Sequence, residues 1–439
     1  MLNEDVKYIL NKLINSDFEA FVVGGAVRNY LLNKKIEDFD ITTSAMPNQI
    51  KSIFEKTIPT GLKYGTITVV INKNLYEVTT FRSDGKYSDG RRPDNVNFSC
   101  ELSEDLKRRD FTVNAMCCDI NEILIDKFDG KHDLKNKIIR CIGNPDDRFK
   151  EDSLRMLRAV RFMSQLGFSI HKDTLLSIKN NSSLIQLVSI ERIQDELNKI
   201  LLSKKPSLGI KKLVETHLID FILPEIIGTV GFEQKNQYHN KDVFEHIMTV
   251  LDNIEPKLNL RLAALLHDIS KPECFTVDDT GRGHFYGHHI MSAEASKIIM
   301  KRLRYSNERI EDVSTLVRYH YLKEIDMKDK GVKRFINNVG ISRLDDMFKL
   351  NIADIKGKKD TTNIEKVEVL RCKCNKIISR NEPICIKDLA IGGMKLKELG
   401  IEQGKVYTEI LRNLLDLVLD NPEYNTKEIL SDYVRKKYL

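Results

Sequence analysis

Asp38 and Asp40 lie one residue apart, and a Gly24-Gly25 turn and Arg28 precede them along the chain. A Gly-Gly turn lets the backbone approach a phosphate closely, because neither residue has a Cβ. Two aspartates at positions i and i+2 of a strand point to the same face of the sheet. Two carboxylates on one face, beside such a turn, can hold the pair of Mg²⁺ ions that phosphoryl or nucleotidyl transfer uses.

The surrounding residues favour a position on a sheet over a solvated turn. Apolar residues precede the glycine turn at 20–23, and Ile41 follows Asp40. Glu77, flanked by apolar residues, is a third carboxylate candidate for the same sheet. A polar, glycine-bearing loop is expected at 83–96. The apolar pattern predicts helices at 5–14 and 27–32, and strands at 18–23, 39–42, 66–71 and 75–81.

The composition fits a chain of several domains and permits, without requiring, a nucleic-acid partner. The chain has 439 residues, of which 31% are charged, with a formal net charge of +6. No apolar run approaches the roughly 18 residues of a membrane span, and the polar N-terminus does not read as a signal peptide. Scattered cysteines without a Cys-x-x-Cys pair indicate reduced thiols. We therefore expect a cytoplasmic protein with no membrane partner.

The pattern changes after the first 140 residues, where helical spacing replaces the alternation of helix and strand. A helical segment at 141–206 is followed by another at 207–360, which contains most of the histidines. The last segment, 361–439, is again helical and ends in basic residues. The sequence thus predicts an α+β protein, with an α/β head at 1–140 and all-helical parts behind it.

Glu151, Asp152 and Arg155 are spaced so that one helix would present all three on one face. They could form an ordinary helix salt bridge, which contributes a few tenths of a kcal/mol. They could also select a base: a carboxylate accepts from the amino group of cytosine or adenine, and a guanidinium donates to the adjacent ring nitrogen. Uracil and guanine present a carbonyl in place of the amino group. A mispaired buried polar group costs roughly 1–3 kcal/mol, enough to exclude both.

Taken together, these motifs resemble the class II tRNA nucleotidyltransferases, the bacterial CCA-adding enzymes, over nearly the whole chain. One departure is Asn29, where the family usually has aspartate, and we expect little effect on the chemistry. The stretches with this resemblance are Gly24-Gly25-Ala26-Val27-Arg28, Asp38-Phe39-Asp40, Arg108-Arg109-Asp110-Phe111-Thr112-Val113-Asn114-Ala115-Met116 and Glu151-Asp152-Ser153-Leu154-Arg155.

The resemblance implies a polymerase β-like nucleotidyltransferase head, a neck with the base-selecting template, a body and a tRNA-binding tail. It implies CTP and ATP as substrates, tRNA as primer, and Asp38, Asp40 and Glu77 as catalytic residues, with Mg²⁺ bound in the head. The loop at 83–96 resembles the segment that the family needs for the final A. The nucleotide-binding residues that it implies are Gly24, Gly25, Arg28, Arg109, Asp110, Asn114, Glu151, Asp152, Arg155, Arg158 and Arg161.

The histidine-rich segment shows the H…HD…D order of HD-domain phosphohydrolases. Lys271 resembles a lysine that often contacts the substrate phosphate. Donors that are all nitrogen or oxygen favour Mn, Fe, Ni or Mg over structural zinc. The segment is either a metal-dependent phosphodiesterase, phosphatase or nucleotidase, or a helical spacer without activity. The candidate metal ligands are His246, His267, Asp268, His288, His320 and Asp354.

Two other functions share many of these features. A poly(A) polymerase or a CC-adding enzyme of the same superfamily would have the same metal site and most of the motifs. Alternatively, the HD phosphohydrolase could be the main activity, with the head serving as an RNA-binding module. The intact Asp38 and Asp40 argue against the latter. The sequence leaves the oligomeric state open.

Overall fold

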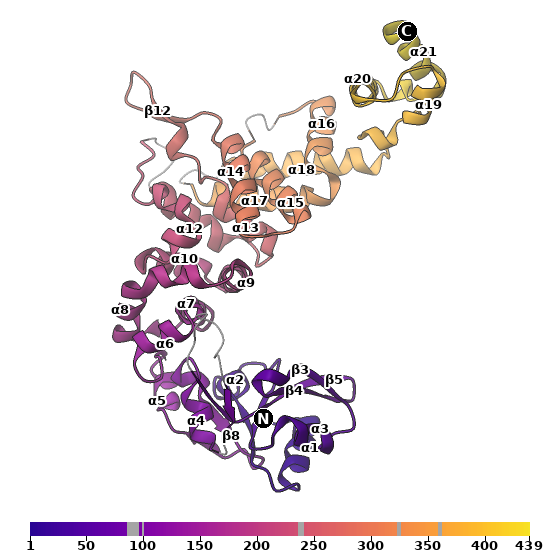
Figure 1. The fold of residues 1–439 in the computed structure, drawn as a ribbon. Coiled ribbons are helices and arrows are strands. Elements are labelled where there is room, and N and C mark those ends of the chain that lie inside the picture. The colour runs from indigo at the N-terminus through magenta and orange to yellow at the C-terminus, as the bar shows by residue number, and fades with distance from the viewer. Residues whose placement is uncertain (86–95, 99–100, 236–240, 323–325, 359–361) are drawn as a thin grey trace. The chain divides into compact units, whose positions relative to one another are not determined.

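The computed structural model describes residues 1–85, 96–98, 101–235, 241–322, 326–358 and 362–439, and the residues between these ranges are not described. The chain folds into two compact units, Met1–Ile227 and Gly228–Leu439 (Figure 1). Most of the loop expected at 83–96 lies outside the described residues.

The first unit contains a mixed sheet with the described strand order β3-β4-β5-β2-β1-β8-β9. Its strands are β1 (Ala20–Val23), β2 (Asp40–Thr43), β3 (Thr57–Gly61), β4 (Thr66–Ile71), β5 (Asn74–Thr80), β8 (Met116–Cys118) and β9 (Leu124–Asp126). Two short pairs are β6 (Arg82–Asp84) with β7 (Val96–Phe98) and β10 (Ile138–Ile139) with β11 (Ser169–Ile170). Its helices are α1 (Glu4–Ile14), α2 (Gly25–Leu31), α3 (Pro47–Ile53), α4 (Leu102–Lys107), α5 (Gly130–Lys135), α6 (Pro145–Glu151), α7 (Leu154–Leu166), α8 (Lys172–Asn181), α9 (Ile190–Leu201), α10 (Pro206–Glu215) and α11 (Ile219–Ile222).

Strand register decides where the carboxylates lie. Antiparallel pairing of β1 with β2 places Val23 opposite Asp40, so the strand that leads to the glycine turn ends beside this aspartate. Parallel pairing of β2 with β5 places Asp40 opposite Glu77. The prediction that Asp38 and Asp40 lie on the same strand is wrong for Asp38. Strand β2 begins at Asp40, and Asp38 lies in the segment before it.

A buried apolar layer supports this end of the sheet. Val23, Phe81, Leu106 and Cys117 form a cluster with at most 9% exposure, with Leu102 at its edge. Burying an aliphatic or aromatic side chain of this kind contributes roughly 1.5–3 kcal/mol. Helix α2 packs on β1 and β8, and α4 contacts β6. The glycine turn and the two aspartates are therefore supported by a well-packed apolar layer.

The predicted template residues Glu151, Asp152 and Arg155 do not share one helix, contrary to the sequence-based expectation. Helix α6 ends at Glu151, and α7 begins at Leu154. Asp152 closes α6 in an extended conformation, with φ of −143° and ψ of 102°. Its carboxylate accepts a hydrogen bond from the backbone N–H of Leu154 at 3.1 Å. This local bond competes with helix continuation, as is usual for aspartate.

The second unit is mainly helical, but its histidine-rich part includes a β-hairpin that the helical pattern had not predicted. The hairpin pairs β12 (Phe275–Val277) with β13 (Gly283–Phe285). In the described part of the chain, no helix has the length and apolarity needed to cross a membrane. The helices of this unit are α12 (Val243–Asn253), α13 (Leu258–Leu266), α14 (His288–Arg302), α15 (Asn307–Tyr319), α16 (Asp329–Val339), α17 (Leu344–Lys356), α18 (Ile364–Ser379), α19 (Gly393–Glu398), α20 (Lys405–Asp420) and α21 (Lys427–Tyr438).

Candidate functional site

The three predicted carboxylates of the head lie at one end of the sheet and repel one another. The surrounding protein raises the pKa of Asp40, and the charge of Asp38 raises it further, while Arg109 opposes the rise. Partial burial raises the pKa of Glu77, and Asp40 and Asp38 add to this effect. Concentrated negative charge of this kind suits divalent cations, which prefer carboxylate oxygens. Within the described residues, these three do not form a group whose ligand atoms all lie within 4.8 Å of one another.

The glycine turn closes against these carboxylates. Gly24 has φ of 77° and ψ of −127°, a conformation that residues with a Cβ rarely adopt. A Cβ at this position would lie 3.4 Å from Nη1 of Arg109 and 3.7 Å from Oδ2 of Asp40. The turn therefore leaves open a space that is bounded by a cation and a carboxylate, as close approach of a metal-bound phosphate requires.

Gly24→Ala is expected to lower nucleotide addition at least tenfold, because the new methyl group enters this space. Backbone strain should also cost about 1–3 kcal/mol of folding free energy. Gly143→Ala is the matched control, since Gly143 has φ of 71° and its Cβ would meet nothing within 4 Å. Steady-state addition and thermal unfolding of both variants separate the two effects. Equal activity losses in both would mean that strain alone is responsible.

Arg109 is held in place by a residue that the sequence analysis missed. Asp105, on α4, is fully buried and pairs with Arg109 at 3.2 Å and with Arg108 at 2.6 Å. Thr42 donates a hydrogen bond at 3.1 Å to Oδ2 of Asp105, the oxygen that Arg109 also contacts. Although burial would raise the pKa of Asp105, the two arginines keep it below the ordinary value. The i,i+3 and i,i+4 spacing of these residues was the available signal.

Asp110 is the centre of a buried network between the head and α7. Arg158 donates to one of its oxygens at 2.6 Å, and Asn114 donates to the other at 3.0 Å. Arg28 donates in turn to Asn114 at 2.6 Å. Although burial would raise it, these partners lower the pKa of Asp110 to about 2, so the carboxylate stays charged. Asn29, the departure from the family pattern, accepts from Arg28 at 2.9 Å.

Arginines converge on one aromatic ring beside this network. The guanidinium carbons of Arg28, Arg158 and Arg161 lie 5.1, 5.4 and 4.1 Å from the ring centre of Phe162. Glu196, on α9, compensates part of this charge, with an oxygen 3.1 Å from Nε of Arg161. Burial lowers the pKa of Arg28 to about 10, and the neighbouring Arg161 and Arg158 add to that decrease. Arg28, Arg158 and Arg161 together form the arginine wall. Its excess positive charge is partly buried and suits binding of a polyphosphate. The sequence analysis did not single out Phe162 and Glu196.

The predicted template residues are held by two separate ion pairs. Glu151 lies 2.5 Å from Nη1 of Arg155, as the spacing predicted. Asp152 instead accepts from both terminal nitrogens of Arg192 on α9, at 3.2 and 2.8 Å. The geometry of a bidentate pair fixes the carboxylate more firmly than a single bond does. Sequence spacing could not place Arg192 against Asp152, since they lie forty residues apart in the chain.

A cavity of about 740 Å³ joins the glycine turn, the arginine wall and the template. Its volume falls within the range usual for ligand sites, roughly 300–1,000 Å³. All of the predicted nucleotide-binding and catalytic residues line this cavity except Glu77 and Glu151. The predicted residues that line it are Gly24, Gly25, Arg28, Asp38, Asp40, Arg109, Asp110, Asn114, Asp152, Arg155, Arg158 and Arg161.

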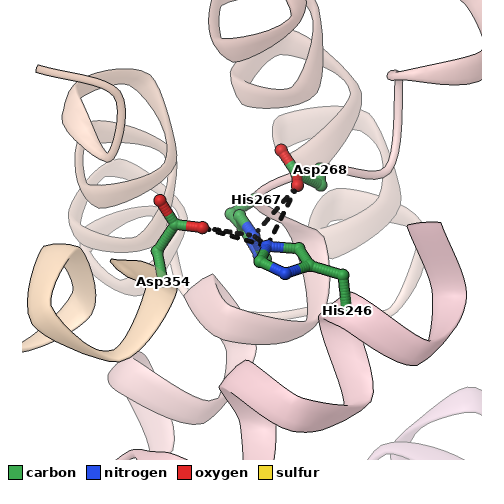
Figure 2. Close-up of side chains that lie close together, drawn as sticks. All are labelled: His246, His267, Asp268 and Asp354. Atoms are coloured by element: carbon green, nitrogen blue, oxygen red, sulfur yellow. Dashed lines mark hydrogen bonds and ion pairs between the residues drawn. The ribbon is translucent and has the colours of Figure 1, made fainter. Parts of the chain in front are cut away.

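The second unit brings the predicted HD ligands together. His246 on α12, His267 and Asp268 after α13, and Asp354 on α17 offer ligand atoms within 4.8 Å of one another (Figure 2). All four are buried, and Nε2 of His246 lies 2.9 Å from Asp354. Asp268, His288 and His320 form a second such group. Asp268 belongs to both groups, so its carboxylate could bridge two ions.

Backbone carbonyls set the orientation of three of these histidines. Nδ1 of His267 lies 2.8 Å from the carbonyl oxygen of Ala264. The same nitrogens of His288 and His320 lie 2.7 and 2.6 Å from carbonyl oxygens. A hydrogen on Nδ1 leaves the lone pair of Nε2 for a metal, which is the usual arrangement in metal sites. The donor set therefore fits divalent metal binding.

A buried lysine, Lys271, lies beside the predicted HD ligands. Nζ of Lys271 lies 2.6 Å from Asp268 and 3.1 Å from the side-chain oxygen of Gln234. Burial would raise the pKa of Asp268, but His267 and Lys271 hold it well below its ordinary value. Metal binding requires a deprotonated carboxylate, and the lowered pKa keeps Asp268 in that state.

Comparison with known proteins identifies similar chains over the full length. Family models match residues 20–140 (poly A polymerase head domain), 167–228 (probable RNA and SrmB-binding site of polymerase A) and 237–349 (HD domain). The CCA-adding enzyme of Ligilactobacillus salivarius is 35% identical over 434 residues, covering 98% of this chain and 95% of that protein. The CCA-adding enzyme of Pediococcus pentosaceus is 49% identical over 218 residues, covering 50% of this chain and 55% of that protein.

Solved structures give the same picture. The crystal structure of the Bacillus stearothermophilus CCA-adding enzyme in complex with CTP matches with a TM-score of 0.71 and 27% identity, covering 98% of this chain and 96% of that one. The Thermotoga maritima CCA-adding enzyme complexed with tRNACCA has the same fold, with a TM-score of 0.58 and 20% identity over 99% of this chain and 96% of that one.

Proposed function

The chain belongs to the CCA-adding enzymes, and from that premise we propose that it adds C, C and A from CTP and ATP to the 3′ end of tRNA, releasing pyrophosphate. The observation that supports this most is the cavity in which Asp38 and Asp40, the arginine wall and the predicted template meet. The proposed parts are a head at 1–140, a neck at 141–206, a body at 207–360 and a tail at 361–439. These substrates would place the reaction in the cytoplasm.

In the proposed mechanism, Asp38, Asp40 and Glu77 would hold two Mg²⁺ ions. The chemistry supplied by such ions would be a lower pKa of the primer 3′-hydroxyl and neutralisation of the charge that develops on pyrophosphate. The hydroxyl oxygen forms a bond to the α-phosphorus of the nucleotide and its proton passes to solvent, while the bond from the α-phosphorus to the oxygen that bridges to the β-phosphate breaks and pyrophosphate leaves. Desolvation by the surrounding protein raises the pKa values of Asp40 and Glu77, the neighbouring carboxylates add to the rise, and bound cations would counter both effects.

The triphosphate would lie between the glycine turn and the arginine wall. Gly24 and Gly25 let the backbone approach the phosphates, and Arg28 and Arg158 supply fixed positive charge. Asp110 keeps Arg158 in place and could accept from the ribose hydroxyls. These groups are held by buried partners before substrate arrives, so little reorganisation is needed when it binds.

Base selection is proposed to rest on Asp152 and Arg155, with Glu151 orienting the arginine. Asp152 would accept from the amino group of C or A, and Arg155 would donate to the adjacent ring nitrogen. The bidentate pair with Arg192 supports this role, because it fixes the orientation of the Asp152 carboxylate. Uracil and guanine would set a carbonyl against this carboxylate.

Asp152→Asn is expected to reduce the preference for CTP over UTP by about 10- to 100-fold, since an amide can donate to the uracil carbonyl. The measurement is kcat/KM for each nucleotide on a tRNA transcript that ends before CCA. Asp147→Asn, an exposed carboxylate of the same helix, is the control and should leave the preference unchanged. An unchanged preference in Asp152→Asn would remove this residue from the template.

The overall reaction is tested with tRNA transcripts that end before CCA, after C and after CC. Each is incubated with Mg²⁺ and with CTP, ATP or both, and the products are sized. Addition of the missing nucleotides and no more is expected. Long A tails on non-tRNA primers would indicate a poly(A) polymerase, and arrest after two C residues would indicate a CC-adding enzyme.

A second activity is proposed for the HD unit, because the six candidate ligands are all buried and meet in two groups. We propose hydrolysis of phosphate esters: a water oxygen bonds to phosphorus, the ester P–O bond breaks, and the alcohol leaves with a proton. A bound divalent ion, with Mn, Fe, Ni or Mg as candidates, would activate the water. Lys271 would neutralise charge on the phosphate.

A further inference from the structure

Arg28 differs from the other arginines that line the nucleotide cavity. Seven arginines line this cavity. Within the part of the chain that the structure describes, six of them form an ion pair with a carboxylate, at 2.5 to 3.2 Å, and Arg28 forms none. No direct carboxylate partner among the described residues therefore cancels the charge of Arg28. The six pairs are those of Arg108 and Arg109 with Asp105, Arg155 with Glu151, Arg158 with Asp110, Arg161 with Glu196 and Arg192 with Asp152.

Two neutral oxygens hold Arg28 instead of a carboxylate. Its Nε and Nη2 donate to the side-chain oxygen of Asn29, at 3.2 and 2.9 Å. Its Nη1 donates to the side-chain oxygen of Asn114 at 2.6 Å. All three nitrogens of the guanidinium thus have an acceptor, and Arg28 is buried. The group is fixed in orientation, and neither acceptor subtracts from its charge.

This charge lies at the glycine turn. A Cβ at Gly25 would lie 3.7 Å from Nη2 of Arg28. Burial lowers the pKa of Arg28 to about 10, and Asp110, which accepts from Nδ2 of Asn114, opposes this decrease. Arg28 is therefore a cation at neutral pH. Because it is fixed and shielded from much of the solvent, it attracts a phosphate more strongly than a hydrated or neutralised cation does.

Asn29 lines the same cavity as Arg28. We propose that Asn29 sets how tightly the cavity holds the nucleotide triphosphate and the pyrophosphate product, because its neutral oxygen orients Arg28 without cancelling its charge. Asn29 is thus a positioning residue that acts through Arg28. A carboxylate in its place would accept the same hydrogen bonds and would pair Arg28 as the other six arginines are paired. The inference rests on the proposed nucleotide addition and adds a residue that determines the affinity for substrate and product.

Asn29→Asp tests the charge with little change of shape. The variant loses one hydrogen bond, which is weak because Nδ2 of Asn29 lies 3.5 Å from the carbonyl oxygen of Lys35. The KM for CTP and the inhibition constant of pyrophosphate are each expected to rise by the same factor, about tenfold. The value of kcat and the preference for CTP over UTP should stay within about twofold of wild type. The primer in these measurements is a tRNA transcript that ends before CCA.

Two further measurements separate charge from packing. Asn33→Asp adds the same charge at an exposed residue just beyond α2, and it should leave both constants within about twofold of wild type. The melting temperature of Asn29→Asp without nucleotide should equal or exceed that of wild type, because the new carboxylate pairs with a buried cation. A lower melting temperature together with a lower kcat would mean that Asn29 only supports the fold, and would overturn the proposal.

The outcomes distinguish the inference from the function on which it rests. If the wild-type chain does not add CMP to the transcript, the proposed function is wrong and the inference falls with it. If wild type adds CMP and Asn29→Asp leaves both constants unchanged, only the inference is overturned. A rise in KM for CTP without a rise in the pyrophosphate constant also overturns it, because the effect would then not act through the phosphates.

Discussion

Asp40→Asn is expected to abolish nucleotide addition, lowering kcat by about 10³-fold or more. Asp40 stands opposite Glu77 in the sheet and beside Asp38, so its carboxylate is central to the proposed metal pair. The amide removes the negative charge of one metal ligand. Metal ions contribute several kcal/mol of transition-state stabilisation, and the loss of this ligand weakens that contribution. Single-turnover addition of CMP to a tRNA transcript that ends before CCA measures the loss.

The same variant should fold at least as well as the wild type at neutral pH. The pKa of Asp40 is raised in the folded chain, so ionising this group disfavours the folded state, and its penalty disappears as pH falls through that raised value. The melting temperature of Asp40→Asn should therefore equal or exceed that of the wild type near pH 7 without Mg²⁺. Glu55→Gln, an exposed carboxylate after α3, is the control for activity. Near-normal addition by Asp40→Asn would contradict the proposed metal site.

His267→Gln is expected to remove metal from the HD centre and to lower phosphate ester hydrolysis by at least about 100-fold. His267 is fully buried, and its Nε2 lies 3.2 Å from Asp268 and 3.8 Å from Asp354. An amide in its place cannot supply the imidazole lone pair, and loss of an oriented ligand weakens the site strongly. Elemental analysis of the purified chain and hydrolysis of a phosphate ester measure both effects.

The His267→Gln variant should add CMP and AMP at a rate within about twofold of wild type. The carboxylates and the template proposed for nucleotide addition lie in the other compact unit, Met1–Ile227. His217 is an exposed histidine that pairs with Asp220, and His217→Gln is the control. This variant should keep the metal of the HD centre. Loss of nucleotide addition together with hydrolysis, in a chain that melts normally, would show that the two centres are not independent.

Local patterns were sufficient wherever the chemistry depends on neighbours in the chain. The Gly-Gly turn before Arg28 and the spacing of Glu151 and Arg155 are short-range features, and the structure has them as expected. The two helices and four strands that were predicted in the first 81 residues match to within a few positions for the same reason, whereas α3 and β3 were not predicted. Apolar periodicity reports one element at a time.

Local patterns gave wrong predictions where a hydrogen bond between a side chain and the nearby backbone interrupted the helical spacing. Asp152 ends α6, although the spacing read as one continuous helix through Arg155. The hairpin at 275–285 was missed because its strands are three residues each, too short for an alternation to stand out. Such details depend on competing local hydrogen bonds, which residue type alone does not resolve.

The sequence by itself determined which chemical groups the protein has and their order: the Asp38 and Asp40 pair, the base-selecting carboxylate and arginine, and the H…HD…D ligands. Only the tertiary structure decided which partners hold them. Glu77 faces Asp40 because β2 and β5 pair in parallel, and Arg192 clamps Asp152 because α9 packs on α7. The physical reason is that strand pairing and helix packing join residues far apart in the chain, and their register follows from the burial of whole faces.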